Sequence, residues 1–275
     1  MNHQWSWQLL RAGSFSLDGG SMFGVVPKAI WSKLIKPDEN NRIRMQTNCL
    51  LLDDGSQKVL IETGFGDKWT EKERSLYDME KRWIVDALSE VGCAPEDINT
   101  VIVTHLHFDH AAGLSRFNES GEAVATFPNA KVFVQQTEWE DALANKSTMT
   151  RTYLRNHLDP IADRLQLVDG EKEILPGIIA WPMVGHTWGQ QALRFSDDKG
   201  TVCFPGDVMP TINHVGPSFN MGYDMLPHQN MISKQQLLER AADDGWRIVL
   251  DHESGEAVVV VKHDPNRKGR FILNS

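Results

Sequence analysis

Short apolar runs recur along the chain, and their lengths and residue types predict strands. They are rich in Val, Ile, Leu and Thr, and most are too short to be helices. The runs occupy residues 4–10, 45–53, 58–63, 100–105, 131–135, 177–185, 200–207, 247–252 and 256–263. Because they lie at both ends of the chain with helix-like stretches between them, the pattern predicts an α/β fold of two packed sheets flanked by helices.

Three stretches have the spacing of amphipathic helices. In residues 75–91 the apolar positions recur at i, i+3, i+4 and i+7, which predicts one helix with a single buried face. A second helix is expected over 137–145, with Thr137 as N-cap and Glu140 as its capping-box partner, and a third over 233–243. No repeat, low-complexity tract or interdomain linker is evident, so residues 1–275 are expected to form one domain.

Two long segments, 19–38 and 210–229, show almost no periodicity. The first carries the apolar residues Met22, Phe23, Val25, Val26 and Trp31 in a setting that suggests exposure. Long irregular segments in compact domains either wrap the core or carry function, and the aromatic and methionine side chains here would also suit a pocket wall. The apolar stretch at Val25 and Val26 is compatible with a lid or with a homodimer surface.

Composition narrows the class of protein. Of 275 residues, 41% are hydrophobic and 24% charged, so a substantial core can form. The net charge of -9 opposes binding to nucleic-acid phosphates, and no apolar run is long enough to span a membrane. The start of the chain lacks the features of a leader, so a cytoplasmic protein is expected. Cys49, Cys93 and Cys203 are far apart in apolar runs and are expected to be buried free thiols.

The strongest chemical signal follows the run at 100–105. The sequence THLHFDH places His105, His107, Asp109 and His110 within six residues. Imidazole and carboxylate groups are ligands of zinc, iron and manganese, and ligands crowded at a strand end can converge on one or two ions.

Three further residues stand directly after strand-like runs: His186, Asp207 and His252. Ligands at the ends of several strands of one sheet can meet at a single edge. Taken alone, Asp207 is equally compatible with capping a turn after Gly206, and His252 with an ordinary surface position.

Together these motifs make the chain resemble the metallo-β-lactamase superfamily. Its H-x-H-x-D-H motif matches residues 105–110, and its later His, Asp and His elements match His186, Asp207 and His252. The resemblance implies an αββα four-layer sandwich with two mixed sheets. It also implies two divalent ions, one held by His105, His107 and His186 and the other by Asp109, His110 and His252, with Asp207 bridging both.

One position departs from the pattern. Glu62 stands before Thr-Gly where many relatives have aspartate. We expect Glu62 to hold a ligating histidine through its other ring nitrogen.

Two such ions would activate water and polarise the substrate, so the resemblance implies a hydrolase. Both ions would position the nucleophile, the first would activate the electrophile, and the second would stabilise the leaving group with Asp109 or Asp207. Zinc is the default expectation, although iron, manganese or cobalt would also suit these ligands.

The segments GGSMFGVVPKAIW, THLHFDHAAGL and GDVMPTINH together look most similar to the branch of N-acyl homoserine lactonases and methyl parathion hydrolase. This resemblance predicts a small ester or lactone substrate, with phosphotriester hydrolysis as a further activity. Some lactonases carry a catalytic tyrosine three residues after the bridging aspartate, where this chain has Pro210. His214 or Tyr223 is the candidate replacement. The expected pocket is apolar, drawing on some of six residues: Met22, Phe23, Trp31, Trp188, Phe219 and Met221.

Other activities are less well matched. Glyoxalase II-like thioesterases share the ligands but generally carry a basic helical C-terminal region, which the tail HDPNRKGRFILNS does not resemble. β-Lactamases usually lack the bridging aspartate, and the acidic total opposes RNA as substrate. A non-hydrolytic redox or sensor protein is a remote alternative that metal content and turnover would separate from the hydrolase.

Overall fold

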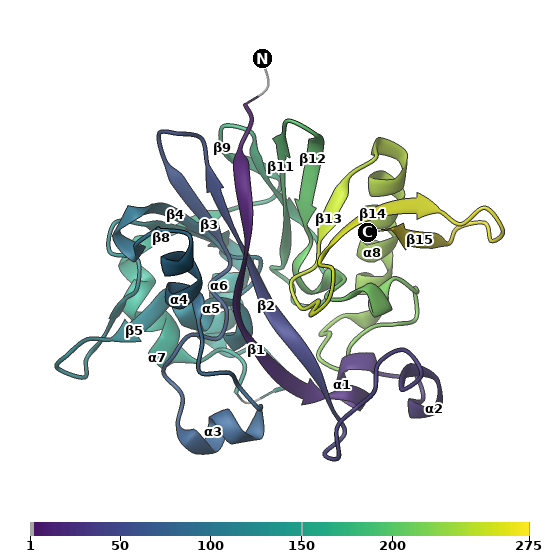
Figure 1. Cartoon of the computed structure of the whole chain (residues 1–275), viewed down its shortest axis with the longest axis horizontal. Coiled ribbons are helices and arrows are strands. Elements are labelled where there is room, and N and C mark those ends of the chain that lie inside the picture. Colours follow the sequence, from purple (N-terminus) through teal and green to yellow (C-terminus); the bar gives the residue numbers. More distant parts are fainter. Residues whose placement is uncertain (1–2, 150, 275) are drawn as a thin grey trace.

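The computed structural model describes residues 3–149 and 151–274 and consists mainly of two mixed β-sheets packed face to face (Figure 1). The first sheet has the strand order β1-β2-β3-β4-β7-β8 and the second β15-β14-β13-β12-β11-β10-β9. The strands of the first sheet are β1 (Ser6–Asp18), β2 (Arg42–Asp53), β3 (Lys58–Ile61), β4 (Ile98–Ile102), β7 (Lys131–Gln135) and β8 (Leu165–Val168). Those of the second are β9 (Lys172–Leu175), β10 (Ile178–Pro182), β11 (Gln191–Asp197), β12 (Gly200–Phe204), β13 (Arg247–Val249), β14 (Val258–His263) and β15 (Phe271–Asn274).

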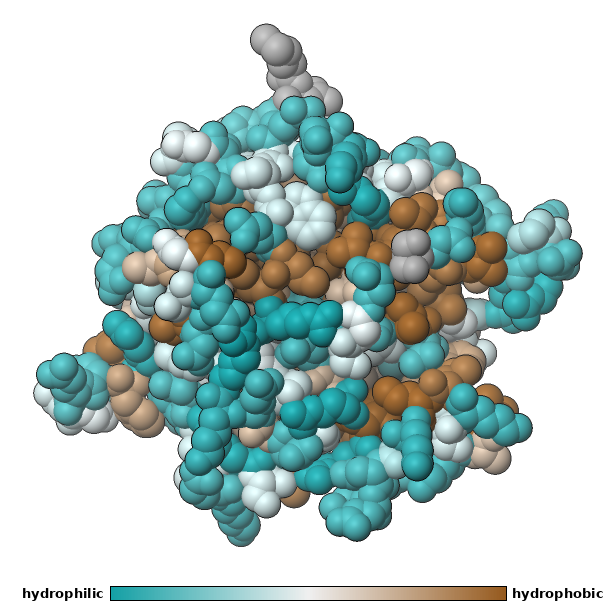
Figure 2. All heavy atoms as spheres, in the orientation of Figure 1, coloured by the Kyte–Doolittle hydropathy of each residue, from teal (hydrophilic) through white to brown (hydrophobic). Residues whose placement is uncertain are grey.

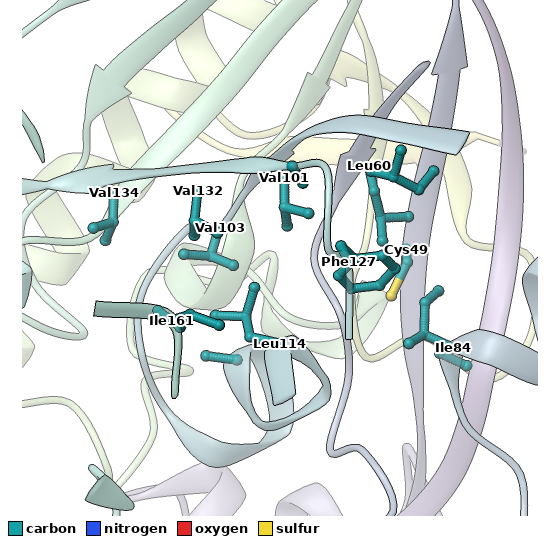
Figure 3. Packing of buried hydrophobic residues seen from close by; sticks show 14 of the residues in the cluster. Cys49, Leu60, Ile84, Val101, Val103, Leu114, Phe127, Val132, Val134 and Ile161 are labelled. Carbon is teal, nitrogen blue, oxygen red and sulfur yellow. The ribbon is translucent and has the colours of Figure 1, made fainter. Parts of the chain in front are cut away.

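Successive apolar side chains of a strand pack on opposite faces of its sheet, so both faces are buried. In β4, Ile102 packs between the two sheets, whereas Val101 packs on the opposite face against the helices. Figure 3 shows this outer cluster, in which Val101, Val103 and Val132 lie near Leu114 and Ile161. Successive side chains of a strand point to opposite faces, so a continuous apolar run is what a central strand of a sandwich requires.

Helices cover both outer faces and complete the four-layer αββα sandwich. On the first sheet lie α4 (Ile84–Glu90), α6 (Gln136–Ala144) and α7 (Arg155–Leu158), and on the second lies α8 (Pro227–Asp244). The remaining helices are α1 (Gly19–Phe23), α2 (Lys28–Trp31), α3 (Glu71–Leu76), α5 (Phe108–Ala111) and the short 3-10 helices η1 (Pro95–Asp97), η2 (Ala112–Leu114), η3 (Asp159–Arg164), η4 (Gly206–Val208) and η5 (Ile212–His214). A small hairpin pairs β5 (Ser115–Phe117) with β6 (Ala123–Ala125). The predicted fold class is confirmed.

The single helix predicted over 75–91 is wrong. The chain forms α3 and α4 instead, separated by a turn in which Asp78 has a φ of 47°. Thr70 and Glu73 form a capping box that starts α3 earlier, and Asp86 accepts a hydrogen bond from the Trp83 N–H at the start of α4. These local caps override the helical spacing of the apolar residues.

The limits of two other predicted helices also change. Helix α6 begins after Gln135, without a side-chain cap from Thr137, and Asn145 ends it in the left-handed conformation. Helix α8 begins at Pro227, six residues before the predicted start, because proline is favoured in the first helical turn.

The apolar residues of segment 19–38 are mostly core rather than surface. Met22, Phe23, Val26 and Trp31 are buried with Phe15 and Met45, and Val25 alone of the five is exposed, at 87%. The Phe23 ring is stacked between Trp31 and His214, with centroid separations of 5.4 and 5.0 Å. Figure 2 shows a face on which apolar residues gather across the centre and polar residues surround them.

Two composition-based expectations can be compared with the structure. The three cysteines are buried free thiols, as expected. Within residues 3–149 and 151–274, no helix combines the length and the apolar character that a membrane crossing requires.

Helix α8 offers a test of the outer layer. Replacing Leu237, which is fully buried against the second sheet, with alanine is expected to lower the free energy of unfolding by about 2–5 kcal/mol, because it leaves a cavity. Ile232 on the same helix is 40% exposed, and Ile232→Ala is expected to change it by less than about 1 kcal/mol. Chemical denaturation of both variants checks the difference, and equal losses would contradict this packing.

Acid should destabilise the protein through His214. Burial lowers the pKa of this imidazole to about 4, and its neutral form is satisfied by Thr211 Oγ1 and the Met22 carbonyl. The unfolded chain binds the proton more readily, so the stabilisation is complete above about pH 6.5 and is lost as pH falls toward 4, by up to about 3 kcal/mol. Unfolding of His214→Gln measured across this range should depend less steeply on pH than that of the wild type; equal slopes would exclude this effect.

Candidate metal centre

All seven predicted ligands lie together at one end of the sandwich. His105 and His107 follow β4, Asp109 and His110 lie in α5, His186 follows β10, Asp207 lies in η4 after β12, and His252 follows β13. Each of these side chains is buried. Four strand ends therefore deliver the side chains to a single small volume.

Two local features hold the backbone in place around these ligands. Gly206 has a φ of 56°, and a Cβ there would lie 2.7 Å from Thr104 Oγ1, so only glycine lets the Asp207 turn approach the β4 end. Thr63 donates hydrogen bonds from both its N–H and its hydroxyl to the His110 carbonyl. The Thr-Gly motif thus anchors α5.

The first cluster consists of His105, His107 and His186. His186 Nε2 lies 2.9 Å from His107 Nδ1, and His186 Nδ1 lies 2.9 Å from Asp224 Oδ1. The carboxylate accepts the Nδ1 hydrogen, and Nε2 faces His107. His105 Nδ1 contacts Thr104 Oγ1 at 3.0 Å, and its Nε2 faces the interior.

The second cluster surrounds His110, Asp207 and His252. His252 Nδ1 donates to the Gln46 carbonyl, and its Nε2 lies 3.2 Å from Asp207 Oδ1 and 3.5 Å from Asp109 Oδ2. His110 Nε2 lies 3.6 Å from Asp207 Oδ1 and 3.9 Å from Asp109 Oδ1. Asp207 also reaches the first cluster, because its Oδ2 lies 3.1 Å from His186 Nε2.

The donor atoms fit two divalent cations. His105, His107 and His186 offer ligand atoms within 4.8 Å of one another, and so do His110, Asp207, Asp251 and His252. Among the described residues, several of these buried atoms have no hydrogen-bond partner; they include His105 Nε2, His110 Nε2, His252 Nε2, Asp207 Oδ1 and Asp251 Oδ2. Buried polar atoms are rarely left unpaired, and a cation between them would satisfy this set.

Burial and charge set the protonation of the cluster. Burial, together with neighbouring histidines, holds the pKa of His105 and His107 well below the usual range, so both present lone pairs. Burial also opposes the charged form of His252, but Asp251 and Asp207 outweigh it and raise its pKa to about 9. A concentration of carboxylates thus favours positive charge at the second cluster.

A cavity of about 460 Å³ opens beside the centre. Its floor contains His107, Asp109, His186, Asp207 and His252. Its walls are formed by Leu17, Met22, Tyr77, Phe108, Thr148, Met149, Arg151, Thr152, Met221 and Tyr223. Of the six residues expected to line the pocket, Met22 and Met221 do so, while Phe23, Trp31, Trp188 and Phe219 lie outside the lining.

The two candidate replacements for the missing tyrosine lie in different places relative to the cavity. Tyr223 lines the cavity, whereas His214 lies outside it with both ring nitrogens occupied by Thr211 and Met22. His214 therefore holds α1 in place through the Met22 carbonyl. The structure brings Asp109 and Asp207 to the cavity floor.

Several residues at the centre were not predicted from the sequence. Asp224 comes from an irregular segment, and Tyr77 ends a helix whose limits were mispredicted. Asp251 stands beside His252 in the sequence LDHE, and that adjacency was a usable signal. Glu62 Oε2 faces His110 Nδ1 at 3.6 Å, beyond hydrogen-bond distance, and its Oε1 accepts from the Thr104 N–H.

Comparison with curated proteins gives relatives of moderate identity. An N-acyl homoserine lactonase of Bacillus thuringiensis is 29% identical over 177 residues, which cover 60% of this chain and 62% of that protein. The chain thus spans less than two thirds of the length of this relative. A "probable metallo-hydrolase" of Mycobacterium tuberculosis is 24% identical over 250 residues, covering 82% of this chain and 76% of the other.

Solved structures agree with the fold. A "probable metal-dependent hydrolase" from Staphylococcus aureus superposes with a TM-score of 0.88 at 29% identity, covering 100% of this chain and 99% of the other. The dizinc quorum-quenching lactonase AidC, in complex with a product, superposes with a TM-score of 0.80 at 18% identity, covering 100% and 95%. The family model described as the metallo-beta-lactamase superfamily matches residues 42–252, which span the whole centre. The chain belongs to the metallo-β-lactamase superfamily.

Proposed function

We propose that the protein is a dinuclear metal-dependent hydrolase of lactones or related esters. The observation that carries this proposal is the position of the two donor clusters at the floor of a cavity with a largely apolar wall. Such a cavity suits a small amphiphilic molecule whose reacting group is directed to the centre.

In this proposal the chain divides its ligands between two ions. His105, His107 and His186 would hold the first, Asp109, His110 and His252 would hold the second, and Asp207 would be shared between them. The ions would supply acidified water as nucleophile and would stabilise the oxygen that gains charge. Zinc is our assignment for the first position, because three imidazoles match its preference.

The orientation of the imidazoles is the contribution of the protein. Asp224 accepts a hydrogen from His186 Nδ1, and the Gln46 carbonyl accepts one from His252 Nδ1, so that the Nε2 atoms of both rings face the centre. Such contacts fix the tautomer and the ring angle of a ligand. Asp109 lines the cavity, and we assign its carboxylate the transfer of a proton to the leaving group.

The cavity wall supports a substrate with an acyl chain. Leu17, Met22, Phe108, Met149 and Met221 supply apolar surface, and methionine adapts to flexible chains. The relatives from Bacillus thuringiensis are N-acyl homoserine lactonases, which supports the lactone assignment. An aryl phosphotriester would also suit this wall, as a secondary substrate.

Tyr223 and Tyr77 are our candidates for the hydroxyl that Pro210 cannot supply. Both line the cavity, and the charge of Asp109 acts on both phenols. Burial raises the pKa of Tyr223 to about 12, and that of Tyr77 also rises through burial. Both phenols therefore stay protonated near neutral pH and can donate a hydrogen bond to a substrate carbonyl.

The first test is metal-dependent turnover. Metal-loaded protein should open a medium-chain N-acyl homoserine lactone, and chelator-treated protein should not, because the nucleophile depends on the ions. An aryl phosphotriester and a thioester serve as parallel substrates. If the lactone remained intact while either of these was cleaved, the lactone assignment would be wrong and the metal mechanism would stand.

The phenols can be tested separately from the metal. Tyr223→Phe should lower kcat by about 100-fold, the usual cost of removing one donor to a developing oxyanion, with metal content unchanged. Tyr77→Phe removes the hydroxyl but keeps the ring, which packs on Phe108 at a centroid separation of 5.4 Å, so a lower kcat/KM in this variant would report the lost hydroxyl and not lost packing.

The third tyrosine provides a matched control. Tyr153 donates its hydroxyl to Glu138 and lies outside the cavity lining, so Tyr153→Phe should leave kcat/KM within about threefold while costing about 1 kcal/mol of stability. Unchanged kinetics in both Tyr77→Phe and Tyr223→Phe would remove the phenols from the mechanism.

A further inference from the structure

His110 is surrounded by more carboxylates than its ring can satisfy. On the Nδ1 side, Glu62 Oε2 lies at 3.6 Å and Asp251 Oδ2 at 3.9 Å. On the Nε2 side, Asp207 and Asp109 lie at 3.6 and 3.9 Å. All five side chains are buried.

Each of the two carboxylates on the Nδ1 side has one oxygen in a hydrogen bond and one without. Glu62 Oε1 accepts from the Thr104 N–H at 2.7 Å, and Asp251 Oδ1 accepts from the His252 N–H at 3.0 Å. Their other oxygens have no hydrogen-bond partner in the part of the chain that the structure describes. A ring nitrogen carries a single hydrogen, so His110 Nδ1 can fully satisfy only one of them.

The geometry distinguishes the two. Glu62 is nearer to Nδ1 and stands outside the donor cluster, as a residue that orients a ligand does. Asp251 instead offers an oxygen that lies within 4.8 Å of the donor atoms of Asp207 and His252. Its unpaired carboxylate therefore faces the same volume as the ligands of the second ion.

We propose that Asp251 is an additional carboxylate ligand of the second ion, and that it makes this position selective for a harder ion than the first. The inference rests on the proposed two-ion site. With Asp251 the second position draws on the carboxylates of Asp109, Asp207 and Asp251, whereas the first has three imidazoles and one shared carboxylate. Oxygen-rich sites suit manganese(II), and imidazole-rich sites suit zinc.

The test is competitive loading of the metal-free full-length protein with zinc and manganese(II). Wild type is expected to bind one zinc and one manganese per chain, read by metal analysis and by electron paramagnetic resonance of bound manganese. Asp251→Asn keeps the shape of the side chain but removes the charge, and should weaken manganese binding by about 10- to 100-fold while retaining zinc at the first position.

Asp224→Asn is the matched control. It alters another buried carboxylate, one that touches His186 of the first cluster. It should weaken zinc at the first position and leave manganese at the second. Wild-type manganese affinity in Asp251→Asn, or equal losses in the two variants, would overturn the proposal.

Anomalous diffraction from wild-type crystals loaded with both metals keeps the proposal testable if Asp251→Asn does not fold. Manganese beside His110 with an Asp251 oxygen in its coordination shell supports it. Zinc in that position, or Asp251 bonded only to protein atoms, refutes it. Since neither readout uses turnover, a chain that loads as expected but opens no lactone would contradict the proposed function alone.

Discussion

The buried carboxylate of Asp207 is the constraint on which the centre depends. Its two oxygens face different clusters, with Oδ2 at 3.1 Å from His186 Nε2 and Oδ1 at 3.2 Å from His252 Nε2. A buried charge is tolerated only when it has partners, and Asp207 has partners in both clusters, so its carboxylate links the two. The sandwich meets this requirement by ending β10, β12 and β13 at one edge, and Gly206 lets the Asp207 turn approach Thr104.

The sequence predicts those parts of this architecture that depend on residues close together along the chain. Strand positions follow from a strong local pattern, as in β4, where Val101 and Ile102 serve opposite faces of one sheet. The metal motif is predictable because its ligands directly follow strands. The helix expected over 75–91 fails because Asp78 adopts a left-handed conformation between two capped helices. Periodicity describes a face, and it says little about where the backbone turns.

Contacts between distant segments are what the sequence does not reveal. His214 has the residue type of a catalytic group, but its partner is the carbonyl of Met22. Asp224 is 38 residues from the His186 that it orients. The apolar residues of segment 19–38 suggest a surface, because their partners Phe15 and Met45 lie in strands that no local pattern connects to them. Only the tertiary fold determines which side chains fill such irregular segments.

The same long-range contacts join the metal centre to the substrate wall. Asp224 Oδ1 orients His186, while its Oδ2 accepts from the Met221 N–H and from Asn230 of α8. Buried Lys234, also on α8, donates to the Phe219 carbonyl and to Asn220 Oδ1. The loop that contains Met221 and Tyr223 is thus hydrogen-bonded to Asp224, which also orients the predicted metal ligand His186. Since Asp224, which holds the His186 ring, and the pocket wall share this network, a change in the loop should alter metal affinity and substrate fit together.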